Sequence, residues 1–326
     1  MKIRCTTLLA GILTAVCLLA LLAEPSEAGQ VSLGIDSNDV LVFTGGAAMV
    51  AAQQNGDLEL LMTLALGPKT PRFRSLAWEG DTVYEQPREM NFGSWRDQLR
   101  RVGATVVLAQ FGQMESLQGQ AGLAGFIQSY DQLLDQFCQQ TSRIVMLSPA
   151  PFEKPQPPLP DLSLRNQNLR LYVLAIGELA RKRNYRFVDV FTTFLDPKSR
   201  DEGFTVDGYQ LGPGGHRAVA VETVRQLGLG KMPKLLLDPR SVSAPGSISD
   251  LRSLILAKNQ LWFDYWRPMN WAFLHGDRTE QPSSRDHRDP RVRWFPEELE
   301  KFLPLIEAKE TAIARSSTEM GLEKAR

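Results

Sequence analysis

Several residues that can do chemistry stand in or near the loops that follow apolar segments of this sequence. Asp81, Glu115 and Asp207 lie in separate loops, Ser116 follows Glu115 directly, and His216 comes nine residues after Asp207. Carboxylates can activate a hydrolytic water or bind a divalent cation, and a histidine can activate a nearby serine. The alternatives are solvated loop carboxylates, a surface or capping histidine and a loop-capping serine. Because the spacing matches no metal motif, we expect no metal and no cofactor.

An alternation of strands and helices must position these residues. Short, nearly continuous apolar runs predict strands that are buried on both faces of a parallel sheet. The strand candidates are Val40–Thr44, Arg72–Ala77, Thr105–Gln110, Arg143–Ser148 and Arg186–Val190. The segments with helical spacing are Ala47–Leu66, Trp95–Val102, Leu123–Gln140, Leu164–Arg183 and Gly212–Leu227. This order predicts an α/β fold with a doubly wound, mainly parallel five-stranded sheet, whose function collects in the loops at the carboxyl ends of the strands.

Four of these loops carry short sequence blocks. They are Thr44-Gly45-Gly46-Ala47, Trp78-Glu79-Gly80-Asp81, Phe111-Gly112-Gln113-Met114-Glu115-Ser116 and Thr205-Val206-Asp207-Gly208-Tyr209-Gln210-Leu211. Their order, spacing and position after successive strands resemble the four conserved blocks of the SGNH (GDSL-type) hydrolase family. The resemblance covers roughly residues 40 to 227. It implies a flavodoxin-like three-layer fold and an activity on ester bonds, such as that of an esterase or a carbohydrate deacetylase.

The resemblance assigns a catalytic role to one residue of each block. The family's serine nucleophile falls on Ala47, and its glycine oxyanion donor falls on Gly80. The asparagine donor falls on Met114. The aspartate that orients the base matches Asp207, but the histidine base itself falls on Gln210. The resemblance therefore implies a degenerate catalytic set in which Gly80 and Asp207 match and the other positions do not.

The loss of these groups bears directly on the reaction. In a serine protease, removing the nucleophile or the base alone lowers kcat by about 10⁶. We therefore expect no serine mechanism and predict an exported protein that acts by binding a small molecule, a glycan or a protein. The alternative is an ester hydrolase with a rearranged catalytic set that uses residues such as His216 or Ser116. The expected partner is a glycan or an ester-bearing small molecule, and a protein partner stays open for the binding function.

Three further residues are candidates for the same pocket. Gly45 and Gly112 belong to the first and third blocks. Asn166 lies at the start of the helix that follows a proline-rich loop between residues 149 and 160. This loop either forms a wall of the pocket or only returns the chain to the next helix.

The amino-terminal residues have the pattern of a secretory leader. A basic start precedes an apolar run, Leu8–Leu22, which is shorter than the roughly 20 residues of a membrane span. We predict a signal peptide over residues 1–28 with cleavage after Ala28, and therefore a secreted or periplasmic protein without a membrane span. An uncleaved anchor is the alternative. Cys138 is the one cysteine beyond this leader, so no internal disulfide is expected, and the balance of 37 basic and 37 acidic residues gives no reason to expect nucleic-acid binding.

The pattern changes after the α/β region. We predict an SGNH-like domain over 38–229, a linker over 230–249, a helical extension over 250–315 and a polar tail over 316–326. The extension carries an aromatic cluster, Trp262, Phe263, Trp266 and Trp271. These aromatics form either a surface that binds sugar or protein, or a clamp that packs the extension onto the domain. The modified first block, the loop Phe111–Ser116 and the tail motifs Asn259–Phe263 and Trp266–Asn270 together also resemble a group of exported SGNH-like proteins from Planctomycetes-type bacteria. The oligomeric state is left open by the sequence.

Overall fold

The computed structural model of the protein describes residues 33–86, 93–200, 203–230, 246–269, 277–281 and 285–323. The predicted leader, most of the predicted linker and Trp271 lie outside these residues. The predicted leader and linker therefore stay predictions.

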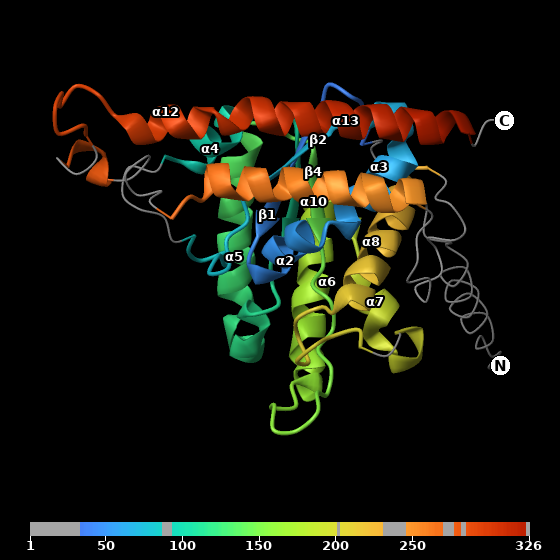
Figure 1. Ribbon diagram of the computed structural model, residues 1–326. Coiled ribbons are helices and arrows are strands. Elements are labelled where there is room, and N and C mark those ends of the chain that lie inside the picture. Colours follow the sequence, from blue (N-terminus) through green and yellow to red (C-terminus); the bar gives the residue numbers. More distant parts are fainter. Residues whose placement is uncertain are drawn as a thin grey trace, which may run out of the picture. The chain divides into compact units, whose positions relative to one another are not determined.

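A parallel five-stranded sheet forms the centre of the protein, with the order β2-β1-β3-β4-β5 (Figure 1). The strands are β1 (Val40–Gly45), β2 (Arg72–Ser75), β3 (Val106–Gln110), β4 (Ile144–Leu147) and β5 (Arg186–Val188). Each lies within or next to a strand predicted from the sequence. The predicted doubly wound α/β fold is thus confirmed, and the order reverses between β1 and β3, where ligands bind in such sheets.

Helices cover both faces of this sheet. Leu41 and Phe43 of β1 pack toward α2 (Ala47–Asn55), α3 (Asp57–Leu66) and α8 (Pro213–Leu227). Val40 and Val42 point to the other face, toward α4 (Trp95–Arg101), α5 (Gly119–Cys138) and α6 (Asn166–Arg183). Successive side chains of a strand point to opposite faces, so the continuous apolar runs supply both cores.

The sequence predicted fewer helices than the described residues form. The predicted helix Ala47–Leu66 is broken at Gly56, whose φ of 79° ends α2 and begins α3. A glycine adopts this left-handed conformation without a steric cost. After β5, Asp189 accepts a hydrogen bond from the backbone N–H of Thr192 and begins the unpredicted helix α7 (Val190–Leu195). Single-turn 3₁₀ helices are η2 (Gly67–Lys69), η3 (Glu115–Gln118), η4 (Ser163–Arg165), η5 (Pro197–Ser199) and η6 (Asp277–Glu280).

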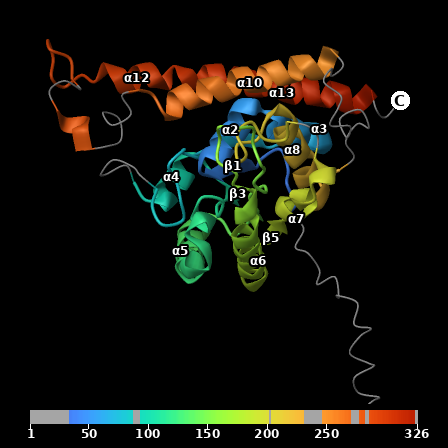
Figure 2. The ribbon, with the colours of Figure 1, turned by 90° about the horizontal axis from the view of Figure 1, so that it is seen from below.

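A carboxyl-terminal helical extension lies along the β2 edge of the sheet. Its helices are α10 (Gly246–Trp266), α12 (Trp294–Glu300) and α13 (Phe302–Glu323). Figures 1 and 2 show α10 and α13 side by side, running in opposite directions. The described part of the predicted polar tail over 316–326 is helical, because α13 continues to Glu323, and Met320 is buried. Covering β2 removes an exposed strand edge that would otherwise be free to pair with another chain.

The aromatic cluster of α10 packs the extension onto the domain. Trp262 and Trp266 are 3% and 2% exposed and stack on each other with 5.7 Å between ring centroids. Trp262 donates from Nε1 to the carbonyl oxygen of Ser75 at 2.8 Å, and the guanidinium of Arg74 lies 4.7 Å from its ring. These two tryptophans therefore form the clamp that was one of the two predicted alternatives, not an exposed binding surface.

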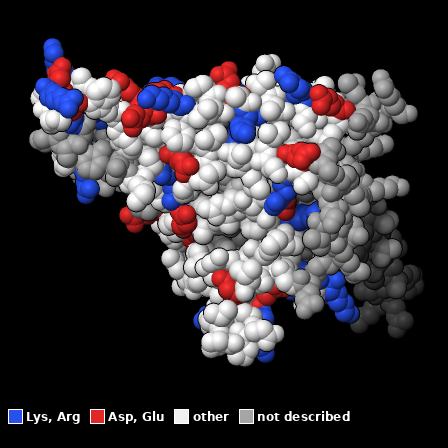
Figure 3. Space-filling model, in the orientation of Figure 1, with Lys and Arg blue, Asp and Glu red and all other residues white. Residues whose placement is uncertain are grey.

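Charged side chains are mixed on the surface. On the face that Figure 3 shows, lysines and arginines are interspersed with aspartates and glutamates, without a basic patch. None of the helices in the described residues is long and apolar enough to span a membrane. Cys138 is a free, exposed thiol whose Sγ lies 2.7 Å from the hydroxyl of Tyr185.

Candidate binding pocket

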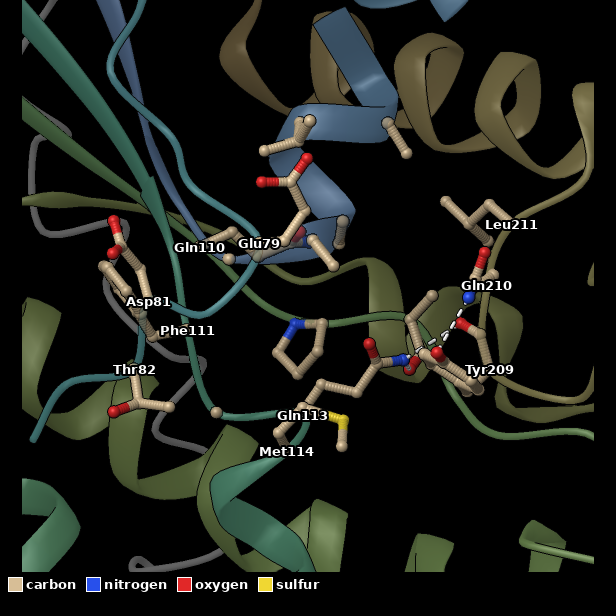
Figure 4. A pocket seen from close by; sticks show the side chains of 18 of the residues that line it. Glu79, Asp81, Thr82, Gln110, Phe111, Gln113, Met114, Tyr209, Gln210 and Leu211 are labelled. Atoms are coloured by element: carbon tan, nitrogen blue, oxygen red, sulfur yellow. Dashed lines mark hydrogen bonds between the residues drawn. The ribbon is translucent and has the colours of Figure 1, made fainter. Parts of the chain in front are cut away.

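A cavity of about 550 Å³ lies at the carboxyl ends of the strands. The loops after β1, β2, β3 and β4 line it, together with the loop before α8 and the first turns of α2 and α8 (Figure 4). This is the place where the reversal of strand order leaves room for a ligand. Its size is in the range of pockets that enclose small molecules.

The cavity brings together most of the positions that the sequence singled out. Those that line it are Ala47, Gly80, Asp81, Gly112, Met114, Glu115, Gln210 and His216. They come from loops far apart in the sequence, and the parallel sheet gathers them at one edge. Gly45, Ser116, Asn166 and Asp207 are not among the lining residues.

The four candidates outside the lining have structural partners. Ser116 is fully buried and donates from its hydroxyl to the carbonyl oxygen of Gln113 at 2.6 Å. Asn166 accepts from the N–H of Phe152 and donates to its carbonyl oxygen, both at 2.8 Å, which holds the proline-rich loop against α6. Ser116 thus shows the loop-capping role that was one of its two predicted alternatives, and the side chain of Asn166 is engaged by Phe152 and not by the cavity.

The first block turns sharply into α2. Gly45 has a φ of 145°, and a Cβ there would lie 2.5 Å from the carbonyl oxygen of Gln110. A Cβ on Gly46 would lie 2.8 Å from the carbonyl oxygen of Asp81. Only glycine fits a backbone approach this close. Ala47 is the first residue of α2, and its methyl group is exposed in the cavity where the family resemblance expects a serine hydroxyl.

The second loop wraps around that turn. The N–H of Trp78 donates to the carbonyl oxygen of Gly45 at 3.1 Å, and the N–H of Asp81 donates to the carbonyl oxygen of Trp78 at 2.9 Å. Gly80 is therefore held beside the start of α2. Asp81 is only 6% exposed although it lines the cavity.

The third loop carries a buried carboxylate and an exposed thioether. Glu115 accepts hydrogen bonds from the N–H of Gly112 at 2.9 Å and from the N–H of Val83 at 3.0 Å. Burial raises the pKa of Glu115, and the backbone hydrogen bonds oppose this rise. Met114, at the position of the family's asparagine, is 52% exposed and offers no hydrogen-bond donor to an oxyanion.

The fourth block holds its carboxylate within its own turn. Asp207 accepts from the N–H of Tyr209 at 3.0 Å and from the N–H of Gln210 at 2.7 Å. The side chain of Gln210 donates from Nε2 to the hydroxyl of Tyr209 at 2.7 Å. Asp207 thus shapes the loop, and in this structure it orients no base.

His216 stands in the first turns of α8 and lines the cavity. Burial lowers its pKa from 6.5 to about 4, so the imidazole is neutral near pH 7. Within the described ranges, no carboxylate forms a hydrogen bond with its ring. His216 is therefore in the neutral form that a general base needs. Among the described residues it has no hydrogen-bonded carboxylate to orient its ring, as such bases have.

Sequence reasoning missed several lining residues. Gln113 donates from Nε2 to the carbonyl oxygens of Ala150, at 3.4 Å, and Tyr209, at 3.3 Å. Figure 4 shows the side chain of Gln113 reaching toward Tyr209. The other missed lining residues include Gln54, Glu79 and Gln110. Gln110 is the last residue of β3, so its place at a strand end was a usable signal, whereas the role of Gln113 depends on contacts between loops.

Two charged side chains that line the cavity, Glu79 and Glu115, already have partners within the protein. No lysine or arginine is among the lining residues of the described chain. Glu79 is paired with Arg267 at 2.6 Å, and Glu115 is held by backbone N–H groups. No cluster of histidine, cysteine, aspartate or glutamate in the described residues is arranged to hold a metal ion. What remains for a ligand is mainly neutral: side-chain amides, a neutral imidazole and apolar surface.

Comparison with known proteins finds likenesses at low identity. Neither a protein-family model nor a curated protein matches the chain. Among solved structures, the chain is similar to a gut microbial diltiazem-metabolizing enzyme, with 18% identity, a TM-score of 0.47 and coverage of 59% of this chain and 47% of that chain. It therefore spans about half of that enzyme's length.

Two further solved structures resemble the chain. One is a catalytic mutant of an acetylxylan esterase from Geobacillus stearothermophilus, with 15% identity, a TM-score of 0.47 and coverage of 61% of this chain and 99% of that chain. The other is an alpha/beta hydrolase enzyme from the metagenome of Lake Arreo, with 14% identity, a TM-score of 0.48 and coverage of 60% and 98%.

Proposed function

We propose that this protein binds an uncharged polar small molecule or glycan in the cavity at the strand ends, and that it does not hydrolyse it by a serine mechanism. The observation that carries this proposal is the methyl group of Ala47 at the start of α2, exposed in the cavity. A methyl group cannot attack an ester. The cavity keeps the size and the position of a ligand site without the nucleophile.

The geometry around the base position supports the same conclusion. Asp207 uses one carboxylate oxygen for two backbone N–H groups of its own turn, and the amide of Gln210 is hydrogen-bonded to Tyr209. An amide does not accept a proton near neutral pH. A serine placed at residue 47 would therefore find no oriented base in this loop.

The available polar groups favour an uncharged ligand with hydroxyl groups. Gln113 and Gln210 use their amide nitrogens within the protein, while no hydrogen bond to their amide oxygens is formed among the described residues. Such oxygens accept hydrogen bonds from hydroxyl groups. Tyr209 also lines the cavity and is only partly buried, so its ring can pack against the apolar face of a sugar.

An ester hydrolase with a rearranged catalytic set is the second candidate. The observation in its favour is that His216, neutral near pH 7, lines the same cavity as Glu115. In this case His216 would act as a general base on a water molecule, and the substrate would be an ester-bearing small molecule or an acetylated carbohydrate.

Turnover of p-nitrophenyl acetate by residues 29–326 separates the two candidates. For a binding protein we expect hydrolysis at the uncatalysed rate, with no change in the variants Asp207→Ala and His216→Ala. An enzyme would show hydrolysis above that rate and lose it in His216→Ala but not in the matched surface variant Asp161→Ala. That second result would replace the binding function with the hydrolase.

Binding is tested with an array of acetylated and unacetylated oligosaccharides, followed by calorimetry on any hit. Ala47→Phe places a ring in the cavity and is expected to abolish binding. Ala121→Phe adds the same ring to the exposed face of α5 and is the matched control. An oligosaccharide that still binds to the Ala47→Phe variant would show that the ligand binds elsewhere, and this result would contradict the assignment of binding to this cavity.

We also propose that the protein is exported, on the strength of the leader pattern over residues 1–28. Expression of the full chain in a bacterial host, followed by sequencing of the amino terminus, tests this. Export with cleavage after Ala28 gives Gly29 as the first residue. An intact Met1 in the cytoplasmic fraction would contradict it.

A further inference from the structure

The carboxyl-terminal extension reaches the rim of the cavity through one side chain. Arg267 directly follows α10, and its Nη2 lies 2.6 Å from Oε2 of Glu79, which lines the cavity on the loop after β2 (Figure 4). Its guanidinium also lies 4.1 Å from the ring centroid of Trp78 and 4.9 Å from that of Phe263. The Arg267 side chain is 14% exposed, so this contact is largely shielded from water. One arginine therefore connects α10 to two adjacent residues of the loop.

That loop forms one wall of the cavity. Trp78 donates to the carbonyl oxygen of Gly45, and the carbonyl oxygen of Asp81 approaches Gly46 so closely that a Cβ would lie 2.8 Å away. Gly45 and Gly46 precede Ala47, the first residue of α2. A displacement of Trp78 would therefore be passed directly to the turn that positions the start of α2.

We propose that Arg267 is a positioning and specificity-determining residue of the binding pocket, supplied by the carboxyl-terminal extension. It holds the loop 78–81 in place by stacking on Trp78, and it neutralises Glu79 so that the rim presents no unpaired negative charge. This inference rests on the proposed function, because it takes the cavity to be the ligand site. It adds that the extension selects an uncharged ligand and is part of the site.

The charge effect follows from the surroundings of Glu79. The Glu79 side chain is 50% exposed, and no lysine or arginine lines the cavity within the described residues. Without Arg267, the carboxylate of Glu79 would stand at the rim without this partner. Its field would then repel anionic molecules that enter the cavity.

A thiol at residue 47 measures the rim charge without any knowledge of the ligand. The variant Ala47→Cys is made in the full chain with Cys5, Cys17 and Cys138 replaced by serine, so that it holds the one thiol. Its alkylation rates with iodoacetate and with iodoacetamide are compared. The same thiolate attacks the iodine-bearing carbon of either reagent and displaces iodide, so the ratio of the two rates cancels the thiolate fraction and reports the electrostatic potential in the cavity.

Arg267→Ala is expected to lower the ratio of the alkylation rate with iodoacetate to that with iodoacetamide by about two- to fivefold. This is the size of effect expected from one negative charge left without its partner at the rim. Arg267→Ala with Glu79→Gln should restore the ratio, because the charge itself is removed. Arg267→Lys should keep it, because the charge next to Glu79 remains. In the cysteine-free full chain, Arg267→Ala should also speed the hydrogen exchange of the Trp78 and Asp81 amides by about tenfold.

Arg74→Ala is the matched control. Arg74 also stacks on a tryptophan of the clamp, Trp262, and also forms an ion pair, with Glu310, but neither contact involves the loop 78–81. It should weaken the packing of the extension and leave both measurements unchanged. Equal effects of Arg74→Ala and Arg267→Ala would overturn the proposal, as would a change in only one of the two measurements for Arg267→Ala. Because neither measurement uses a ligand, these outcomes are independent of whether the oligosaccharide array finds a binder.

Discussion

The buried ion pair between Lys258 and Glu59 gives the largest expected effect on stability. Nζ of Lys258 lies 2.8 Å from Oε2 of Glu59, and the two side chains are 2% and 4% exposed. The ammonium also lies 3.5 Å from the carbonyl oxygen of Phe73. The pair therefore connects α10 to α3 and β2. Burial lowers the pKa of Lys258, and the attraction of Glu59 opposes this.

Lys258→Met keeps most of the apolar stem and removes the ammonium group. It leaves Glu59 as a carboxylate without this partner at a site where its side chain is only 4% exposed. Breaking a buried pair in this way costs about 3–5 kcal/mol, because the remaining charge keeps its full desolvation penalty. For a domain of this size, a loss of that magnitude lowers the melting temperature by roughly 6–20 °C.

The double variant Lys258→Met with Glu59→Leu removes both charges. Apolar replacement of a buried pair is often neutral or stabilising, so we expect it to recover most of the loss. Urea unfolding, followed by circular dichroism and tryptophan fluorescence, measures both variants. The matched surface pair is Arg181 and Glu178, which are 76% and 68% exposed, and Arg181→Met should change the free energy of unfolding by less than about 0.5 kcal/mol.

Two results would refute this reasoning. One is a loss below about 1 kcal/mol in Lys258→Met, which would mean that Glu59 takes up a proton or gains water without difficulty. The other is a double variant as unstable as the single one, which would assign the loss to packing of the stem and not to the unpaired charge.

Further predictions concern the pocket. Burial lowers the pKa of His216 from 6.5 to about 4, so the unfolded chain binds more protons between these values and the free energy of unfolding should fall from pH 6.5 to pH 4, by at most roughly 3 kcal/mol. His216→Gln should remove this part of the pH dependence in urea titrations, whereas the same change at the exposed His287 should not. Ala47→Ser alone should leave p-nitrophenyl acetate hydrolysis within about twofold of the unchanged protein, because Gln210 is no base; a burst of nitrophenol would contradict this. Gln113→Ala removes two hydrogen bonds between loops and should lower the free energy of unfolding by about 1–2 kcal/mol, with a loss below 0.3 kcal/mol arguing against its bridging role.

The sheet was predictable because its signal is local. Strands such as Val106–Gln110 are buried on both faces, and this shows in the sequence as an uninterrupted apolar run. The pocket followed from the sheet, since parallel strands place their carboxyl ends together. The break at Gly56 was missed because α2 and α3 are both apolar, and a glycine within such a run reads equally well as part of one helix.

Side-chain roles were less predictable than positions. Asn166 begins α6 and Ser116 directly follows Glu115, which lines the cavity. The side-chain hydrogen bonds of these two residues nevertheless go to Phe152 and Gln113 and not to the cavity. Polar residues near a turn have several backbone partners within reach, and sequence spacing does not choose among them. The contact between Arg267 and Glu79 joins residues 188 positions apart, and no local pattern encodes it.

The wall that carries Gly80 is held at both of its ends. Arg267 fixes Trp78 and Glu79 from the side of the extension, and Glu115 accepts a hydrogen bond from the N–H of Val83 on the side of β3. A wall tied at both ends loses little freedom when a ligand arrives, so less of the binding free energy is spent on ordering it. A serine hydrolase uses such rigidity to aim donors at a developing oxyanion. In the proposed binding protein, with Ala47 where the family resemblance expects the nucleophile, the rigidity serves no such reaction. It can still serve selection by shape and by charge, so the proposed binding function depends on this wall and on the side chain of Arg267, which pairs with Glu79 at its rim.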